Sequence, residues 1–103
     1  MNKLTIIGNL TREPELRQVG EDKTVCNMTV AVNGRTKDSP STFFRVSVWN
    51  GLGEKCEQYL HKGSKVCVIG RVDVSTYQSS DGTTRASLDV LAEEVEFLTP
   101  RAQ

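Results

Sequence analysis

One stretch of the chain, residues 42–50 with the sequence T-F-F-R-V-S-V-W-N, carries two large aromatic side chains and a cation at alternate positions. With the two-residue period of a β-strand, Phe43, Arg45 and Trp49 share one face, together with Ser47. On the opposite face, Phe44, Val46 and Val48 form an apolar row. An aromatic ring can stack on any nucleobase and a guanidinium can bind a phosphate. The pattern therefore predicts a strand with one face toward the core and one face suited to a nucleic-acid ligand.

The residue types that most often carry catalysis do not form a recognisable site. The single histidine, His61, lies beside Lys62 near the end of a predicted helix, a position typical of a solvated side chain. The densest carboxylates, Glu93, Glu94 and Glu96, are interleaved with apolar residues in strand fashion, which favours an exposed edge over an acid/base pair. The chain has no P-loop, serine nucleophile elbow or metalloprotease helix. We therefore expect neither an enzyme nor a cofactor.

The three cysteines do not indicate a metal site. Cys26, Cys56 and Cys67 lie 30 and 11 residues apart, which matches no zinc-binding spacing, and their odd number leaves one thiol unpaired in any disulfide scheme. Each falls in the apolar pattern of its predicted strand or helix, so we expect small buried hydrophobic side chains.

Length and composition indicate one globular domain. A chain of 103 residues can bury a sizeable core without a metal or disulfide, and 25% charged with 37% apolar residues is ordinary for such a domain. The net charge is zero, but residues 1–85 carry 12 basic and 9 acidic side chains and residues 86–103 carry 1 and 4. A neutral total can therefore hide a basic face. Because no signal-peptide core or bilayer-length apolar run is present, we expect a cytoplasmic protein with no membrane contact.

The apolar pattern predicts an all-β fold. Five strands are expected at residues 3–9, 24–33, 42–50, 65–77 and 84–97. The segment around Glu13-Pro14-Glu15 is expected to be irregular and to lead into a turn at residues 20–23.

One short helix is expected between the third and fourth strands. From residue 50 onward, Leu52, Cys56 and Leu60 fall at helical spacing, and Gly63 is the expected end of the helix. Five strands with a helix at this point is the order of an OB-fold, a partly open barrel that often binds oligonucleotides across its second and third strands. The aromatic and basic row of residues 42–50 falls on that third strand.

The chain also resembles the bacterial single-stranded DNA-binding protein family. The segments that carry the resemblance run in order along the chain: N2-K-L-T-I-I-G-N-L10, E13-P-E-L-R17, V25-C-N-M-T-V-A31, F44-R-V, E57-Q-Y-L-H-K-G-S64, I69-G-R71, D81-G and E94-V-E-F-L98. The resemblance implies a homotetramer of OB-folds that coats single-stranded DNA in replication, recombination and repair, associated with the nucleoid or with phage or plasmid DNA.

The resemblance also implies roles for individual residues. Phe43 and Tyr77 stand where the family usually has stacking tryptophans, and Trp49 stands where it has a phenylalanine. We expect these three rings to stack on bases. Five cations are expected to bind phosphates: Arg35, Lys37, Arg45, Lys62 and Arg71.

The sequence departs from the family pattern in three places. The usual Trp-His-Arg of the third strand is Phe43-Phe44-Arg45 here, and Thr36 replaces a further stacking tryptophan. The basic run before the fourth-strand aromatic is Asp73-Val74-Ser75-Thr76, which lowers the expected affinity. The sequence ends at Gln103 without the acidic tip that recruits replication and repair proteins, which leaves such partners open. We expect residues 1–99 to form the DNA-binding domain and residues 100–103 to be a remnant of the tail.

Two other functions fit the same fold. An OB-fold accessory protein of a primosome-type complex would use the aromatic residues against a protein partner. An RNA-binding OB module would share the stacking rings and would in addition contact the 2′-hydroxyl.

Overall fold

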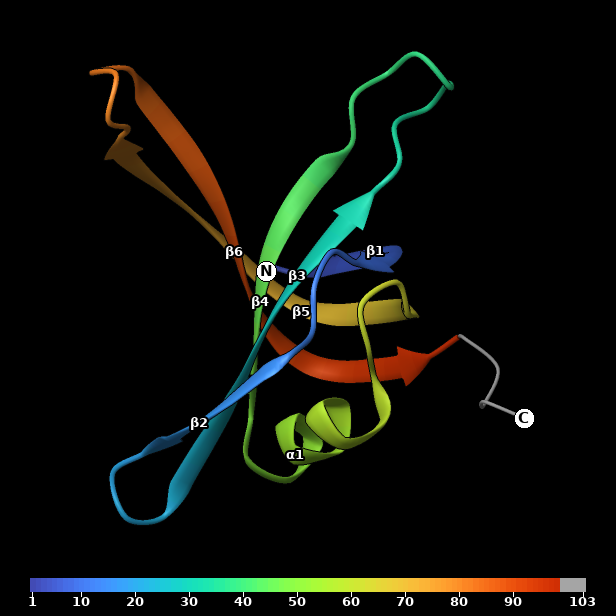
Figure 1. The fold of residues 1–103 in the computed structure, drawn as a ribbon, viewed down its shortest axis with the longest axis vertical. Helices are drawn as coiled ribbons and strands as arrows, with labels where there is room; N and C mark the ends of the chain where they lie inside the picture. Colours follow the sequence, from blue (N-terminus) through green and yellow to red (C-terminus); the bar gives the residue numbers. More distant parts are fainter. Residues whose placement is uncertain (99–103) are drawn as a thin grey trace.

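The computed structural model describes residues 1–98, and it contains six strands and one helix (Figure 1). In chain order the elements are β1 (Leu4–Leu10), β2 (Glu15–Val19), β3 (Lys23–Val32), β4 (Thr42–Trp49), α1 (Asn50–Tyr59), β5 (Lys65–Gln78) and β6 (Thr84–Phe97). The C-terminal remnant expected at residues 100–103 lies outside the described residues.

Five of the strands close into a ring. The hydrogen-bonded order is β1-β5-β6-β4-β3-β2, and β1 also pairs with β3, so that β1, β5, β6, β4 and β3 form a barrel. All pairings are antiparallel except that of β4 with β6, which is parallel and only three residue pairs long. The helix lies between β4 and β5 in the chain and covers the lower end of the barrel (Figure 1). The all-β OB-fold with one helix between its third and fourth barrel strands is confirmed.

Strand β2 was not expected from the sequence, and it lies in the segment that was expected to be irregular. It pairs with β3 alone, outside the ring, through a hairpin whose turn contains Gly20 at φ 66°. All five of its residues are exposed, so no buried face imposes an apolar pattern on it. Its backbone hydrogen bonds to β3 hold it in place, and such bonds leave no mark in the sequence.

The core is formed mainly by inward-facing residues of the barrel strands. Cys26, Met28 and Val30 of β3 are buried against Val46 and Val48 of β4. Phe44 is partly buried and packs against the same cluster. The alternation predicted for these two strands is therefore confirmed.

The cysteines are buried and free, as expected. Burial raises the pKa of the Cys26 thiol to about 11 and that of the Cys56 thiol to about 12, so both remain protonated at neutral pH. Within residues 1–98, no cluster of histidine, cysteine and carboxylate side chains could hold a metal ion. No helix in this part of the chain is long and apolar enough to cross a membrane.

Helix α1 ends earlier than expected. Its last residue is Tyr59, and Leu60 is already extended while its N–H donates to the carbonyl of Cys56. Gly63 therefore does not end the helix. It lies at φ 92° in the connection to β5, where its N–H donates to the carbonyl of Leu10.

A glycine allows α1 to pack closely on the end of β4. A Cβ atom added at Gly53 would lie 2.2 Å from the carbonyl oxygen of Val48 and 3.2 Å from the Cβ of Cys26. Gly51, on the same helix, has open space at the corresponding position. Packing therefore requires a glycine at position 53 but not at position 51.

These two glycines give a matched pair of substitutions. Gly53→Ala should destabilise the protein by about 1–3 kcal/mol, because the methyl group must displace backbone. Gly51→Ala should stabilise it by about 0.5–1 kcal/mol, because alanine loses less conformational freedom in a helix. Urea unfolding of both variants measures the difference. Equal stabilities would show that α1 does not pack as described.

Candidate nucleic-acid interface

The outer face of β4 carries the row predicted from the sequence. Phe43 is 57% exposed and Trp49 is 37% exposed, and Arg45 between them is also exposed. Neither ring is a core side chain. The position of the row agrees with the sequence analysis, and its role remains a prediction.

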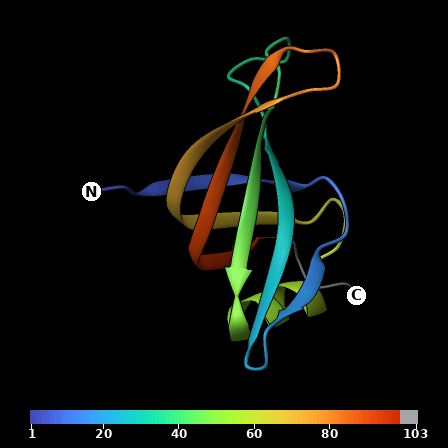
Figure 2. The same ribbon diagram turned by 90° about the vertical axis from the view of Figure 1, so that its left-hand side faces the viewer.

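Strand β4 lies between β3 and β6 in the sheet (Figure 2), and their register extends this row onto both neighbours. Directly paired residues present their side chains on the same face of a sheet. Arg45 is paired with Thr29 of β3 and with Asp89 of β6. Ser47 is paired with Asn27 of β3 in the same way, and Asn27 Oδ1 accepts a hydrogen bond from the Ser47 hydroxyl at 3.4 Å. The outer surface of β3, β4 and β6 is therefore polar around a cation and is flanked by rings.

Tyr77 lies farther along the β5–β6 hairpin. It is 51% exposed and is paired with Arg85 of β6. Asp73 is paired with Asp89, so alternation along β5 places Tyr77 on the same face as the Arg45 row. The tip of this hairpin and the loop between β3 and β4 lie at the same end of the molecule in both views (Figures 1 and 2).

Arg45 is held by a carboxylate that the sequence analysis did not identify. Its Nε lies 3.7 Å from Asp89 Oδ1, and its Nη1 donates to the Ser87 hydroxyl at 3.5 Å. The hydroxyls of Ser75 and Ser87 donate to the two carboxylate oxygens of Asp89 at 2.9 and 3.0 Å. Asp73 is the direct neighbour of Asp89 across β5 and β6. The centre of the face is therefore locally acidic, and Arg45 forms an ion pair with Asp89 while its side chain remains largely exposed.

The other predicted cations occupy three different places. Arg71 lies on β5, paired with Leu91, which is itself paired with Ser47, so it belongs to the β4 face. Arg35 and Lys37 line a hollow of about 430 Å³ in the loop between β3 and β4. That loop also contains Thr36, whose hydroxyl bonds the Ser39 hydroxyl at 2.9 Å.

Lys62 lies apart from these cations. Its backbone N–H donates to Glu13 Oε2 at 2.8 Å, in the connection between β1 and β2. This hydrogen bond, together with that from His61 to Glu13 Oε1, holds the pKa of the Glu13 carboxyl below its ordinary value. His61 is exposed, as expected for a solvated side chain. Its Nδ1 lies 3.3 Å from Glu13 Oε1.

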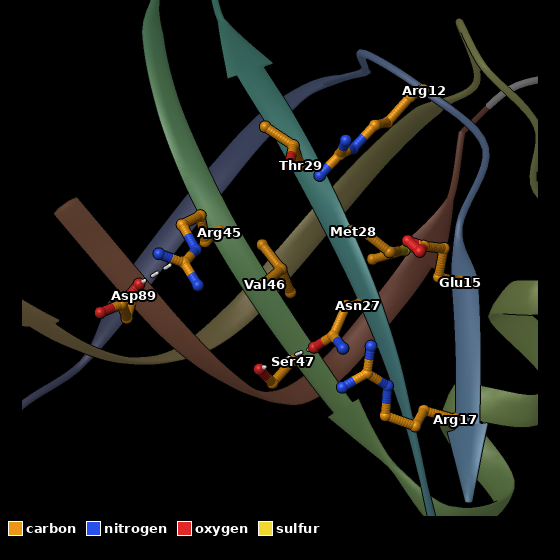
Figure 3. Close-up of a pocket in the computed structure, with 10 residues that line it drawn as sticks. All are labelled: Arg12, Glu15, Arg17, Asn27, Met28, Thr29, Arg45, Val46, Ser47 and Asp89. Carbon is orange, nitrogen blue, oxygen red and sulfur yellow. Dashed lines mark hydrogen bonds and ion pairs between the residues drawn. The ribbon is translucent and has the colours of Figure 1, made fainter. Parts of the chain in front are cut away.

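A polar groove of about 400 Å³ borders the row on the β2 side (Figure 3). Its lining comes from β2, β3, β4, β6 and the connection before β2: Arg12, Glu15, Arg17, Asn27, Met28, Thr29, Arg45, Val46, Ser47 and Asp89. The sequence analysis assigned no role to Arg12 or Arg17. Arg17 lies on β2 and Arg12 lies in the connection before it, and the apolar pattern did not predict this strand.

Comparison with known proteins gives one consistent result. The model of the family described as "Single-strand binding protein family" matches residues 1–98. A protein from Clostridium acetobutylicum named "Single-stranded DNA-binding protein 1" is 36% identical over all of this chain and 98% of its own length. A second protein from that organism, "Single-stranded DNA-binding protein 2", is 39% identical over 95% of this chain and 77% of its own length. A "Single-stranded DNA-binding protein" from Bifidobacterium longum is 37% identical, and the match spans 46% of that longer relative.

The carboxylate at the centre of the face generates a prediction. Asp89→Asn retains the shape and an acceptor oxygen for the serine hydroxyls, but it releases Arg45 and removes a charge that repels phosphates. Affinity for a dT oligomer should rise by about 0.2–1 kcal/mol, the range for an exposed ion pair. Asp22→Asn, an equal change of charge in the exposed turn between β2 and β3, is the control. If both variants bind alike, or if Asp89→Asn binds more weakly, Asp89 does not compete with the ligand for Arg45.

Proposed function

The chain belongs to the single-strand binding protein family, and from this premise we propose that it binds and coats single-stranded DNA irrespective of sequence, in replication, recombination and repair. The observation that carries the proposal is the outer face of β4, where Phe43 and Trp49 are exposed on either side of Arg45. Proteins of this family bind DNA and are not enzymes, which agrees with the absence of any catalytic motif in the sequence.

The mechanism follows from the two kinds of side chain on this face. Every base has a π-face, so stacking on Phe43, Trp49 and Tyr77 tolerates any sequence. Cations then bind the phosphates between stacked bases. Arg45 and Arg71 lie on the same face as the rings. Arg35 and Lys37 are exposed in the loop between β3 and β4, and this loop lies at the same end of the molecule as the β5–β6 hairpin tip (Figure 2). Lys62 is the least well placed of the five.

The alternative functions are less well supported. A primosome-type accessory protein or an RNA-binding module could use the same fold, but the family match and the names of the relatives favour single-stranded DNA.

Assembly and localisation are carried over from the family. Its members are typically homo-oligomers, and we infer a homotetramer in which residues 1–99 of each chain form one DNA-binding domain. Several faces could then share one strand, which raises the overall affinity through effective concentration. The proposed location is the cytoplasm, on exposed single-stranded DNA.

Trp49 is the only tryptophan, so its fluorescence reports on one site. Addition of poly-dT should quench its emission, and Trp49→Ala should cost about 1–3 kcal/mol in affinity. Oligo-U should compete less well than oligo-dT if the protein is a DNA coat and not an RNA-binding module. Unchanged emission at saturating poly-dT would exclude stacking at Trp49, and unfolding of Trp49→Ala would show that the ring is chiefly structural.

Salt dependence separates stacking from phosphate binding. Arg45→Ala should flatten the plot of log K against log salt by about 0.7, the contribution of one phosphate on a single strand. Phe43→Ala should lower the affinity at every salt concentration and leave the slope unchanged, because stacking releases no counterions. Titration of both variants with a dT oligomer over about a tenfold range of NaCl makes the comparison. The opposite pattern would exchange the roles assigned to the two residues.

A further inference from the structure

Strand β2 and the connection before it place two arginines near the β4 face. Arg17 lies on β2 and is paired with Val25 of β3, which is in turn paired with Trp49. Arg12 lies in the connection before β2, where the N–H of the adjacent Thr11 donates to the carbonyl of Thr29 at 2.9 Å. Thr29 is the partner of Arg45. Arg17 therefore lies two strands away from Trp49 across the sheet, and Arg12 lies next to a residue that is hydrogen-bonded to the partner of Arg45.

Val25 lies between Arg17 and Trp49 in the sheet. It is only 6% exposed although its side of β3 faces outward. The register therefore places a nearly buried apolar side chain between Trp49 and Arg17 on this side of β3.

The three arginines that line the groove differ in whether their side chains form ion pairs. Arg45 is held by Asp89. Within residues 1–98, the side chains of Arg12 and Arg17 make no hydrogen bond or ion pair, and both residues are exposed. Figure 3 shows them extending from one side of the groove toward β3, with Arg45 on the other side. Two unpaired guanidinium groups on one rim of a polar groove suit an anionic ligand.

We propose that this groove binds the sugar–phosphate backbone of the single strand as it leaves the β4 rings, with Arg12 and Arg17 as phosphate-binding residues. The proposal rests on the proposed function and extends the bound path from β4 across β3 to β2. Glu15, paired with Asn27, lies between the two arginines on the same rim. Its charge opposes a phosphate, so we place the phosphates at the two arginines on either side of Glu15.

The test is the salt dependence of binding to a dT oligomer of about sixteen nucleotides, long enough for the upper range of one OB-fold. The variants are Arg12→Gln, Arg17→Gln and the double variant, because glutamine removes the charge and keeps much of the stem that can cover Val25. Each single change should lower the magnitude of the slope of log K against log salt by about 0.7, and the double change by about 1.4. Over a tenfold range of salt, a change of 0.7 in slope corresponds to about a fivefold difference in the loss of affinity.

Two controls make the result specific. Lys55→Gln removes a cation from an exposed position on α1, which does not line the groove, and should leave the slope unchanged. Arg17→Lys retains the charge and should keep most of the slope. Wild-type slopes in both arginine variants, with normal binding of dT, would overturn this inference and leave the proposed function standing. Failure of the wild-type protein to bind the dT oligomer at the lowest salt concentration would instead contradict the proposed function.

Discussion

The pairing of β4 with β3 is the constraint on which the rest of the structure depends. It runs through eight residue pairs, from Val25↔Trp49 to Val32↔Thr42. The same register places Val46 and Val48 in the core and Phe43, Arg45 and Trp49 outside. Because side chains alternate, a slip of one residue would bury the cation and expose the valines. Folding and ligand binding are therefore specified by one set of hydrogen bonds, and the core enforces the geometry of the outer face.

The sequence was sufficient for the parts of the fold that a buried face controls. The barrel strands, the helix and the exposure of Phe43 and Trp49 follow from apolar periodicity, which the core requires. Tyr77 was identified only through the family resemblance, because residues 73–78 of β5 are exposed on both faces. Strand β2 was missed because its five side chains are all exposed and only its backbone is constrained. Asp89 was missed because the parallel pairing of β4 with β6 joins positions far apart in the chain. No local pattern encodes such a pairing.

Although the net charge of the chain is zero, its acidic and basic residues lie in different parts of the surface. Acidic residues meet at the centre of the proposed interface, where Asp73 and Asp89 are direct neighbours. The unpaired arginines lie to one side, beyond β3, and Arg35 and Lys37 lie in the loop at one end of β3 and β4. Apart from Arg45 and Arg71, the cations proposed to bind the phosphate chain therefore lie at the margins of the face, and the rings lie on either side of Arg45. This division of labour suits a binder that makes no use of base identity.

The ring of strands is closed unevenly. Strands β5 and β6 share a long antiparallel ladder, whereas β4 and β6 are joined by three residue pairs and β1 and β3 by two. The short seam between β4 and β6 runs through Arg45 and Asp89, beneath the proposed interface. A DNA strand that contacts both β4 and the β5–β6 hairpin would bridge this seam and hold its two sides together. A ligand that binds only the closed barrel also stabilises it. DNA binding would therefore also protect the contact between β4 and β6 against local opening.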